Sequence, residues 1–182
     1  MPGAAAAAAA GDEANVHVTV RVRPFTARER DVGAKSCLHS NGDAIGALSV
    51  TDAASRRRHD FRFDTCHWAV NETGDGNGMG QGQEDVYADI GERALDNAWQ
   101  GYNVGIFAYG QTGSGKSYSM VGGGGSSGGG GGGSGAGGGG EDERGIIPRF
   151  SAELFARIEH EKSSGEVRVE VSMLEIYCER VR

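Results

Sequence analysis

"YGQTGSGKSYSM", residues 109–120, is the stretch of this sequence that decides the fold. Its spacing, Gly110-x-x-x-x-Gly115-Lys116-Ser117, matches the pattern of a phosphate-binding P-loop. The chain holds 33 glycines, so a chance match has to be weighed. The chain's own residue frequencies give about 0.01 accidental matches over its whole length, which makes the pattern informative.

The residue types in this loop suit a nucleoside triphosphate. Gly110, Gly113 and Gly115 allow tight turns that aim backbone N–H groups inward, and the start of the following helix adds a partial positive charge. Lys116 can bridge the β- and γ-phosphates as a point charge, and the Ser117 hydroxyl can hold Mg²⁺. The predicted phosphate-binding residues are Gly110, Gln111, Thr112, Gly113, Ser114, Gly115, Lys116 and Ser117.

The segments on either side of the loop predict an α/β fold. Residues 104–108 (VGIFA) form a nearly continuous apolar run, which is typical of a parallel strand buried on both faces. Residues 116–121 can open a helix directly after the loop. The order strand, glycine loop, helix is the context that a P-loop requires.

Alternating apolar and polar residues predict further strands. The valines of residues 16–22 alternate with polar residues, and Pro24 ends that strand because it has no N–H to donate. Shorter strands are expected at residues 47–50 and 61–63, and a longer one at residues 167–177.

Two helices are expected around the loop. The first runs over residues 84–100, where apolar residues recur at helical spacing, and Gly101 suits the position just past its end. The second begins near Pro148, which is tolerated close to a helix N-terminus. Its apolar stripe is expected to be core rather than a partner-binding face, and consists of Phe150, Leu154, Phe155 and Ile158.

Composition excludes several classes of function. The formal charge of −7, from 18 basic and 25 acidic residues, argues against a broad nucleic-acid-binding surface. Cys37, Cys66 and Cys178 are an odd, widely spaced set, which indicates free thiols in a reducing compartment. The histidines and cysteines offer no ligand pairs with zinc spacing, so no metal site of that kind is expected. No apolar stretch has the length of a membrane span, and the expected location is the cytoplasm.

Three low-complexity segments are expected to lie outside the folded core. Residues 1–14 are an Ala-rich stretch expected to be a disordered leader, and residues 74–82 are a Gly-rich loop. In residues 122–140, 15 of 19 residues are glycine, which predicts a flexible coil with a root-mean-square span of about 24 Å. The folded domain is therefore expected at residues 15–182, carrying both loops as surface insertions.

The flanks of the loop narrow the kind of P-loop protein. YNVGIFAYGQTGSGKSYSM (residues 102–120) closely resembles the P-loop segment of kinesin motor domains. Further segments resemble the same family in the same order; they are VRVRPF (20–25), FRFD (61–64), QEDVY (83–87), GIIPR (145–149) and EIYCERVR (175–182). In its details the chain is most similar to the third, vesicle-transporting kinesin class. The resemblance implies an α/β P-loop NTPase fold, here a partial motor domain with an incomplete central mixed sheet.

The resemblance also implies roles for individual residues. Arg21 and Pro24 would line the adenine side of a nucleotide pocket, and Tyr118 would offer a ring face there. Residues 110–117 would hold the phosphates and Mg²⁺ of ATP. Tyr87 would either approach the base or be a core aromatic, and the sequence leaves both readings open.

The sequence also departs from the family. Kinesin motor domains are roughly twice this long. Both switch motifs, of the Asn-x-x-Ser-Ser-Arg-Ser-His and Asp-Leu-Ala-Gly-Ser-Glu types, are absent, as are the later elements that grip the microtubule. We therefore expect no catalytic residue in this chain. An ATP-driven motor with the microtubule as partner, located at the cytoskeleton, is expected of the complete protein, and no pattern identifies its cargo.

Two other readings remain at this point. A catalytically inactive kinesin remnant would act as a nucleotide- or partner-binding module. A P-loop transporter ATPase or kinase would need an acidic metal ligand after an apolar strand, and the sequence shows no such residue.

Overall fold

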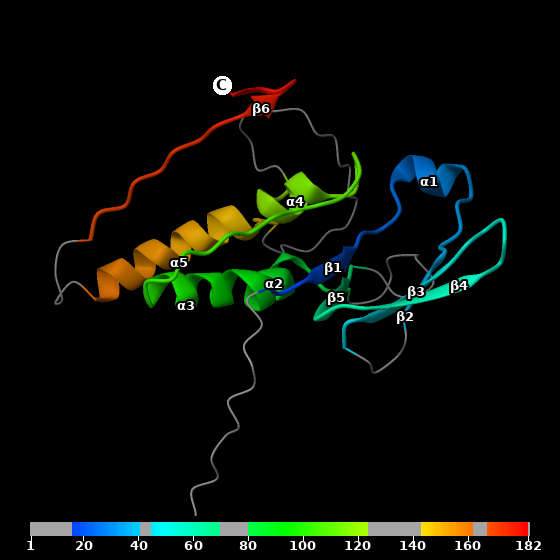
Figure 1. Cartoon of the computed structure of the whole chain (residues 1–182), viewed down its shortest axis with the longest axis horizontal. Coiled ribbons are helices and arrows are strands. Elements are labelled where there is room, and N and C mark those ends of the chain that lie inside the picture. Colours follow the sequence, from blue (N-terminus) through cyan, green and yellow to red (C-terminus); the bar gives the residue numbers. More distant parts are fainter. Residues whose placement is uncertain (1–15, 41–44, 70–79, 124–142, 162–166, 182) are drawn as a thin grey trace, which may run out of the picture.

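The structure is a computed structural model that describes residues 16–40, 45–69, 80–123, 143–161 and 167–181. Within these ranges the chain is a mixed α/β structure (Figure 1). A two-stranded parallel sheet lies beside a long helix, and a three-stranded antiparallel sheet lies to one side of them. A small hairpin stands apart at the C-terminal end.

Several expectations fall on residues outside this description. They are the leader at residues 1–14, residues 74–79 of the first Gly-rich loop, and residues 124–140 of the second. The part of the first loop that is described, residues 80–82, has no regular secondary structure and leads into a helix.

The two-stranded parallel sheet carries Arg21. Here β1 (Thr19–Val22) pairs in parallel with β5 (Thr65–Trp68). β1 confirms the strand expected within residues 16–22, and it ends two residues before Pro24. β5 was not expected, although its four residues, TCHW, alternate between polar and apolar.

The antiparallel sheet has β3 at its centre. Its strands are β2 (Leu38–Ser40), β3 (Ala47–Thr51) and β4 (Arg58–Arg62). β3 confirms the strand expected at residues 47–50. β4 begins three residues before the strand expected at residues 61–63, because it pairs with β3 along the whole of β3.

One continuous helix follows the first Gly-rich loop. Its three parts are α2 (Gln83–Val86), the π-helical turn η1 (Tyr87–Gly91) and α3 (Glu92–Trp99). The helix expected at residues 84–100 is confirmed, and Gly101 follows it with a φ of +92° that favours glycine. The π-helical turn was not predicted. The position of Gly91 in this turn requires glycine, because a Cβ there would collide with the Tyr87 ring.

Two more helices complete the core. They are α4 (Lys116–Met120) and α5 (Ile146–His160). The buried cluster consists of Val86, Tyr87 and Ile146, and the partly buried Ile90, Ile106, Met120 and Phe150 pack against it. Both helices were expected, and α5 lies along α3 (Figure 1). The expected core role is wrong for Phe155, which is more than half exposed.

A short helix, α1 (Ala27–Asp31), was not predicted although the sequence carries its signal. The Glu29 N–H donates to the Thr26 hydroxyl, and the Glu29 carboxylate accepts from the Thr26 N–H at 2.7 Å, which is a capping box. Arg23 donates two hydrogen bonds of 2.8 Å to the same carboxylate. The hydrogen bonds from Arg23 and Thr26 lower the pKa of Glu29 to about 2.

Two of the predicted strands are not formed. Residues 104–108 have no hydrogen-bonded neighbouring strand among the described residues, and Phe107 is 92% exposed. Residues 167–175 are likewise unpaired within the described ranges and exposed. Only Ile176–Tyr177 (β6) enters a strand, as half of a hairpin with Arg180–Val181 (β7). A strand exists only where a neighbour accepts and donates its backbone hydrogen bonds, so the predictions of a buried strand and of a long strand are wrong here.

Candidate functional site

The glycine loop has the backbone shape that its sequence predicts. Gly113 and Gly115 have φ values of +80° and +101°, in the left-handed region that favours glycine. A Cβ at either position would meet nothing within 4 Å, so the backbone conformation and not crowding calls for glycine. Gly110, at a φ of +150°, has the Ser114 side chain where a Cβ would lie. The loop therefore leaves open space over its central glycines.

Lys116 closes the loop with its side chain. Its Nζ donates to the Gly110 carbonyl at 2.7 Å and to the Gln111 carbonyl at 2.9 Å. The ammonium is thus bound to polar backbone atoms of the loop and is not buried against hydrocarbon. Lys116, which was predicted to bind phosphate, therefore keeps its ammonium against the loop. Thr112 and Ser117, in the same loop, are exposed.

The backbone N–H groups of the loop are largely available. The Ser114 N–H donates to the Gln111 carbonyl at 3.2 Å. Within the described ranges, no hydrogen bond engages the N–H groups of Gly113, Gly115 or Lys116. Unpaired amides next to an ammonium are donors that suit an anion with several oxygens.

Arg21 and Tyr118, both predicted from the resemblance, meet beside the loop. The Arg21 Cζ lies 5.0 Å from the centroid of the Tyr118 ring, at cation–π distance. Arg21 Nη1 also donates to Ser119 Oγ at 3.0 Å. Burial lowers the pKa of Arg21, and the phenol of Tyr118 and the carboxylate of Glu143 act in the opposite direction. The pair links β1 to the helix that follows the loop.

Pro24 and Tyr87, the other two residues considered for the adenine side of the pocket, have different outcomes. Pro24 follows the end of β1 and is exposed. Tyr87 is buried in the core, and its hydroxyl donates to Glu153 Oε2 at 2.6 Å. Burial and this hydrogen bond raise the pKa of Tyr87. Of the two readings left open for Tyr87, the structure bears out the core aromatic.

Two residues of this region were missed from the sequence. Gln83 is buried, and its side chain bonds to Arg21. Glu143 follows the second Gly-rich run, and its Oε2 accepts from the Tyr118 hydroxyl at 2.6 Å. Burial and this bond raise the pKa of Tyr118 to about 12. Gln83 begins the family-like segment QEDVY, but that likeness gave no role to its side chain, and Glu143 lies outside the quoted segments. Contact between segments far apart in the sequence brings both residues here.

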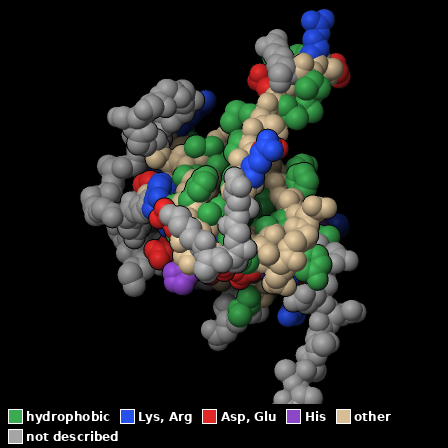
Figure 2. Space-filling view, turned by 90° about the vertical axis from the view of Figure 1, so that its left-hand side faces the viewer, with side chains coloured by type: hydrophobic (Ala, Val, Ile, Leu, Met, Phe, Trp, Pro, Cys, Tyr) green, Lys and Arg blue, Asp and Glu red, His purple; other side chains and the backbone are tan. Residues whose placement is uncertain are grey.

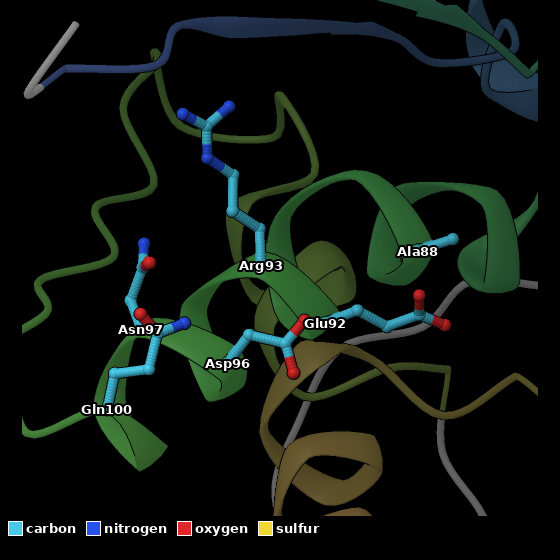
Figure 3. A pocket seen from close by; sticks show the side chains of 6 residues that line it. All are labelled: Ala88, Glu92, Arg93, Asp96, Asn97 and Gln100. Carbon is cyan, nitrogen blue, oxygen red and sulfur yellow. The ribbon is translucent and has the colours of Figure 1, made fainter. Parts of the chain in front are cut away.

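A hollow of about 370 Å³ lies away from this region (Figure 3). It is lined by side chains of η1, of α3 and of the residue just after α3, namely Ala88, Glu92, Arg93, Asp96, Asn97 and Gln100. The hollow is open and polar, and no residue of the glycine loop reaches it. It does not enlarge the candidate site.

Other site types find no support in the described part of the chain. No group of three or more His, Cys, Asp or Glu side chains there could hold a metal ion. No helix among those residues has both the length and the apolarity that crossing a membrane takes. Cys37, Cys66 and Cys178 are all free, as expected.

The arrangement of an apolar segment, a glycine loop and a helix beside a parallel strand pair defines a partial P-loop NTPase fold of class α/β. Comparison with known families makes this more specific, since the model of the kinesin motor domain matches residues 21–182. The chain therefore belongs to the kinesin motor-domain family, which confirms the resemblance read from its sequence.

Individual relatives agree with this assignment. The chain is 41% identical over 178 residues to the rat kinesin-like protein KIF28, which covers 92% of this chain and 15% of that protein. It is 40% identical over 170 residues to the human kinesin-like protein KIF1C, covering 93% of this chain and 14% of the relative. It is 41% identical over 171 residues to the Caenorhabditis elegans kinesin-like protein unc-104, with 92% and 10% covered.

Solved structures show the same fold. A KIF14 chain solved with ADP in complex with a microtubule superposes with a TM-score of 0.62 at 36% identity. The match covers 82% of this chain and 35% of the KIF14 chain. This chain thus spans about a third of that solved chain and about a seventh of KIF28.

Proposed function

We propose that this chain is the ATP-binding part of a kinesin-type microtubule motor. In the complete protein, ATP hydrolysis would be coupled to movement along microtubules, and the protein would reside on the microtubule cytoskeleton in the cytoplasm. The chain itself holds the nucleotide and contributes no catalytic residue. The assignment to the kinesin family supports this proposal.

One observation carries the nucleotide site. The loop has two left-handed glycines with open space over them, unpaired N–H groups among the described residues, and a lysine ammonium at its edge. This combination places unpaired N–H donors and an ammonium in one loop, with open space over Gly113 and Gly115, which are features that suit a polyphosphate. The described residues therefore fit the group that the family implies.

The loop residues divide the work of binding. Gly110, Gln111, Thr112, Gly113, Ser114 and Gly115 would cradle the phosphates, Lys116 would neutralise their charge, and Ser117 would hold Mg²⁺. Arg21, Pro24 and Tyr118 would form the base side. When bound, Mg·ATP supplies a γ-phosphoryl group whose transfer to water releases free energy. The chain's own residues bind and orient that nucleotide.

A titration of the 182-residue chain with Mg·ATP tests the site. Lys116→Ala should weaken binding at least tenfold, because a charge-assisted contact to phosphate is lost. Lys35→Ala removes an exposed lysine elsewhere and should leave the affinity unchanged. Equal affinities for the wild-type chain and Lys116→Ala would refute the proposed site and leave a remnant that binds partners only.

A turnover assay separates binding from catalysis. Because the chain lacks both switch motifs, microtubules should not stimulate ATP hydrolysis by it. Robust stimulation would show that this chain supplies catalytic groups that the proposal denies it. Binding without turnover is the expected result.

A further inference from the structure

Gln83 is a buried polar side chain that the nucleotide site as described leaves without a role. It is the first residue of α2 and is only 6% exposed. Its Oε1 accepts from Arg21 Nη1 at 2.8 Å. Its Nε2 donates to the Tyr118 carbonyl at 2.7 Å and to the Glu143 carbonyl at 3.3 Å. One amide therefore joins β1, α4 and the segment before α5.

The three partners of Gln83 also contact one another. The Arg21 guanidinium lies over the Tyr118 ring, and the Tyr118 hydroxyl donates to the Glu143 carboxylate. Tyr118 is thus held at three places, which are the face of its ring, its hydroxyl and its backbone carbonyl. Gln83 takes part in the first of these contacts through Arg21 and in the third directly.

An amide is the chemical group that this position requires. An arginine only donates hydrogen bonds and a carbonyl only accepts them, so the residue between them must accept on one side and donate on the other. A carboxylate would satisfy Arg21 but would turn an acceptor toward two carbonyl oxygens. Since the position is buried, a partner left without a hydrogen bond would be costly.

We propose that Gln83 is a positioning residue for recognition of the nucleobase. It holds Arg21 and Tyr118 at a fixed separation, so that a base meets a ring face that is already in place, while the glycine loop holds the phosphates independently. Groups locked by their supporting contacts bind with less loss of entropy than groups that must order on binding. This inference rests on the proposed nucleotide site and adds the residue that fixes the positions of Arg21 and Tyr118 within it.

The test compares a ligand that has a base with one that lacks it. The wild-type chain is titrated with Mg·ATP and with magnesium tripolyphosphate, and the ratio of the two dissociation constants measures the contribution of adenosine. Gln83→Met keeps the volume of the side chain but removes all three hydrogen bonds. We expect it to weaken ATP binding about tenfold and to change tripolyphosphate binding less than about twofold.

Two further variants complete the design. Gln100→Met makes the same change at an exposed position just past the other end of the helix, and should alter neither constant. Gln83→Glu retains the acceptor for Arg21 but loses both donors, and should also lower the preference for ATP over tripolyphosphate. If Gln83→Met does not give the far-UV circular dichroism of the wild-type chain, the Gln83→Glu ratio decides.

The outcomes separate this inference from the site on which it rests. An unchanged ratio of dissociation constants in the Gln83 variants overturns the inference. If the ratio is unchanged because both ligands bind more weakly to the same extent, the role of Gln83 is in folding alone. If Lys116→Ala weakens both ligands while the Gln83 ratio is unchanged, the proposed site stands and only the inference fails. If neither ligand binds the wild-type chain, both are overturned.

Discussion

The junction between the parallel strands and the long helix can be set beside the two extended segments at residues 104–108 and 167–175. In the long helix Leu95 is completely buried, and Asp89 is hydrogen-bonded to Thr19 of β1, to His67 of β5 and to His17, which precedes β1. In the extended segments Phe107 and Met173 are more than nine-tenths exposed. Figure 2 shows the C-terminal hairpin standing out from the rest of the molecule with apolar side chains at its surface.

The difference teaches that an apolar pattern becomes structure only when a neighbour is present. Residues 104–108 are as apolar as any core strand, yet they find no neighbouring strand in the described part of the chain. Unpaired backbone and exposed apolar side chains together make an edge that tends to associate with other chains. The KIF14 chain that shares this fold extends well beyond the matched portion, which is 35% of it.

Asp89 explains why the junction is firm. This residue of η1 accepts from His17 Nε2 at 3.0 Å, from Thr19 Oγ1 at 2.9 Å and from His67 Nε2 at 2.9 Å. Burial acts to raise the pKa of Asp89, but the hydrogen bonds from His67, Thr19 and His17 outweigh it and hold this pKa below its usual range. One carboxylate thereby ties the helix to β1 and β5.

Truncating one leucine in each region should show the largest contrast. Leu95→Ala should lower the free energy of unfolding by about 2–5 kcal/mol, because it leaves a cavity at a fully buried position. Leu174→Ala, the same change at a side chain that is 65% exposed, should cost less than about 0.5 kcal/mol. Urea unfolding followed by circular dichroism measures both. Similar losses would mean that the extended segment is packed in solution.

Replacing Asp89 should have the next largest effect. Asp89→Asn puts an NH₂ group where the carboxylate accepts hydrogen bonds, and should cost about 1–3 kcal/mol at pH 7. The pKa of Asp89 is lowered on folding, so its contribution is fully present above the unfolded value of about 3.9 and is lost as the pH falls through the folded value. The stability gap between wild type and variant should therefore shrink below about pH 4. A gap that stays constant to low pH would exclude this role.

A pair of tyrosines gives a smaller contrast. Tyr87→Phe removes the hydrogen bond to Glu153 from the core and should cost about 1 kcal/mol. Tyr109→Phe makes the same change at a fully exposed side chain of the glycine loop and should leave the free energy of unfolding unchanged. Thermal unfolding distinguishes them. If Tyr109→Phe is less stable than Tyr87→Phe, the Tyr109 side chain is buried in solution, which would contradict the prediction.

Phe107 should likewise contribute little to stability. Phe107→Lys should change the free energy of unfolding by less than about 0.5 kcal/mol, because this side chain is already in solvent. The added charge should reduce self-association of the chain, since it interrupts an exposed apolar edge. Val32→Lys adds the same charge at an exposed position after α1 and serves as the control. Sedimentation velocity measures the association, and equal profiles for both variants would contradict the prediction.

The elements that the sequence predicted share one property, which is that their signals are local. The P-loop pattern, the helical spacing of residues 84–100 and the glycine that ends that helix are all carried by neighbouring residues. The capping box of Thr26 and Glu29 was equally local, and attention to it would have predicted α1. The alternation of TCHW was also a local sign of β5. The pairing of β5 with β1 and the meeting of Gln83 with Arg21 could not be predicted in this way, because they depend on contacts across dozens of residues.

By itself, the sequence determined the conformation of the glycine loop, the helix that follows it and the membership of the kinesin family, because each is fixed by residue types at fixed spacing. Only the tertiary structure decided which apolar segments are buried, that Tyr87 belongs to the core, and that one buried amide joins Arg21 to Tyr118. The physical reason is that burial and side-chain hydrogen bonding are properties of pairs of segments, and a single segment does not encode its partner.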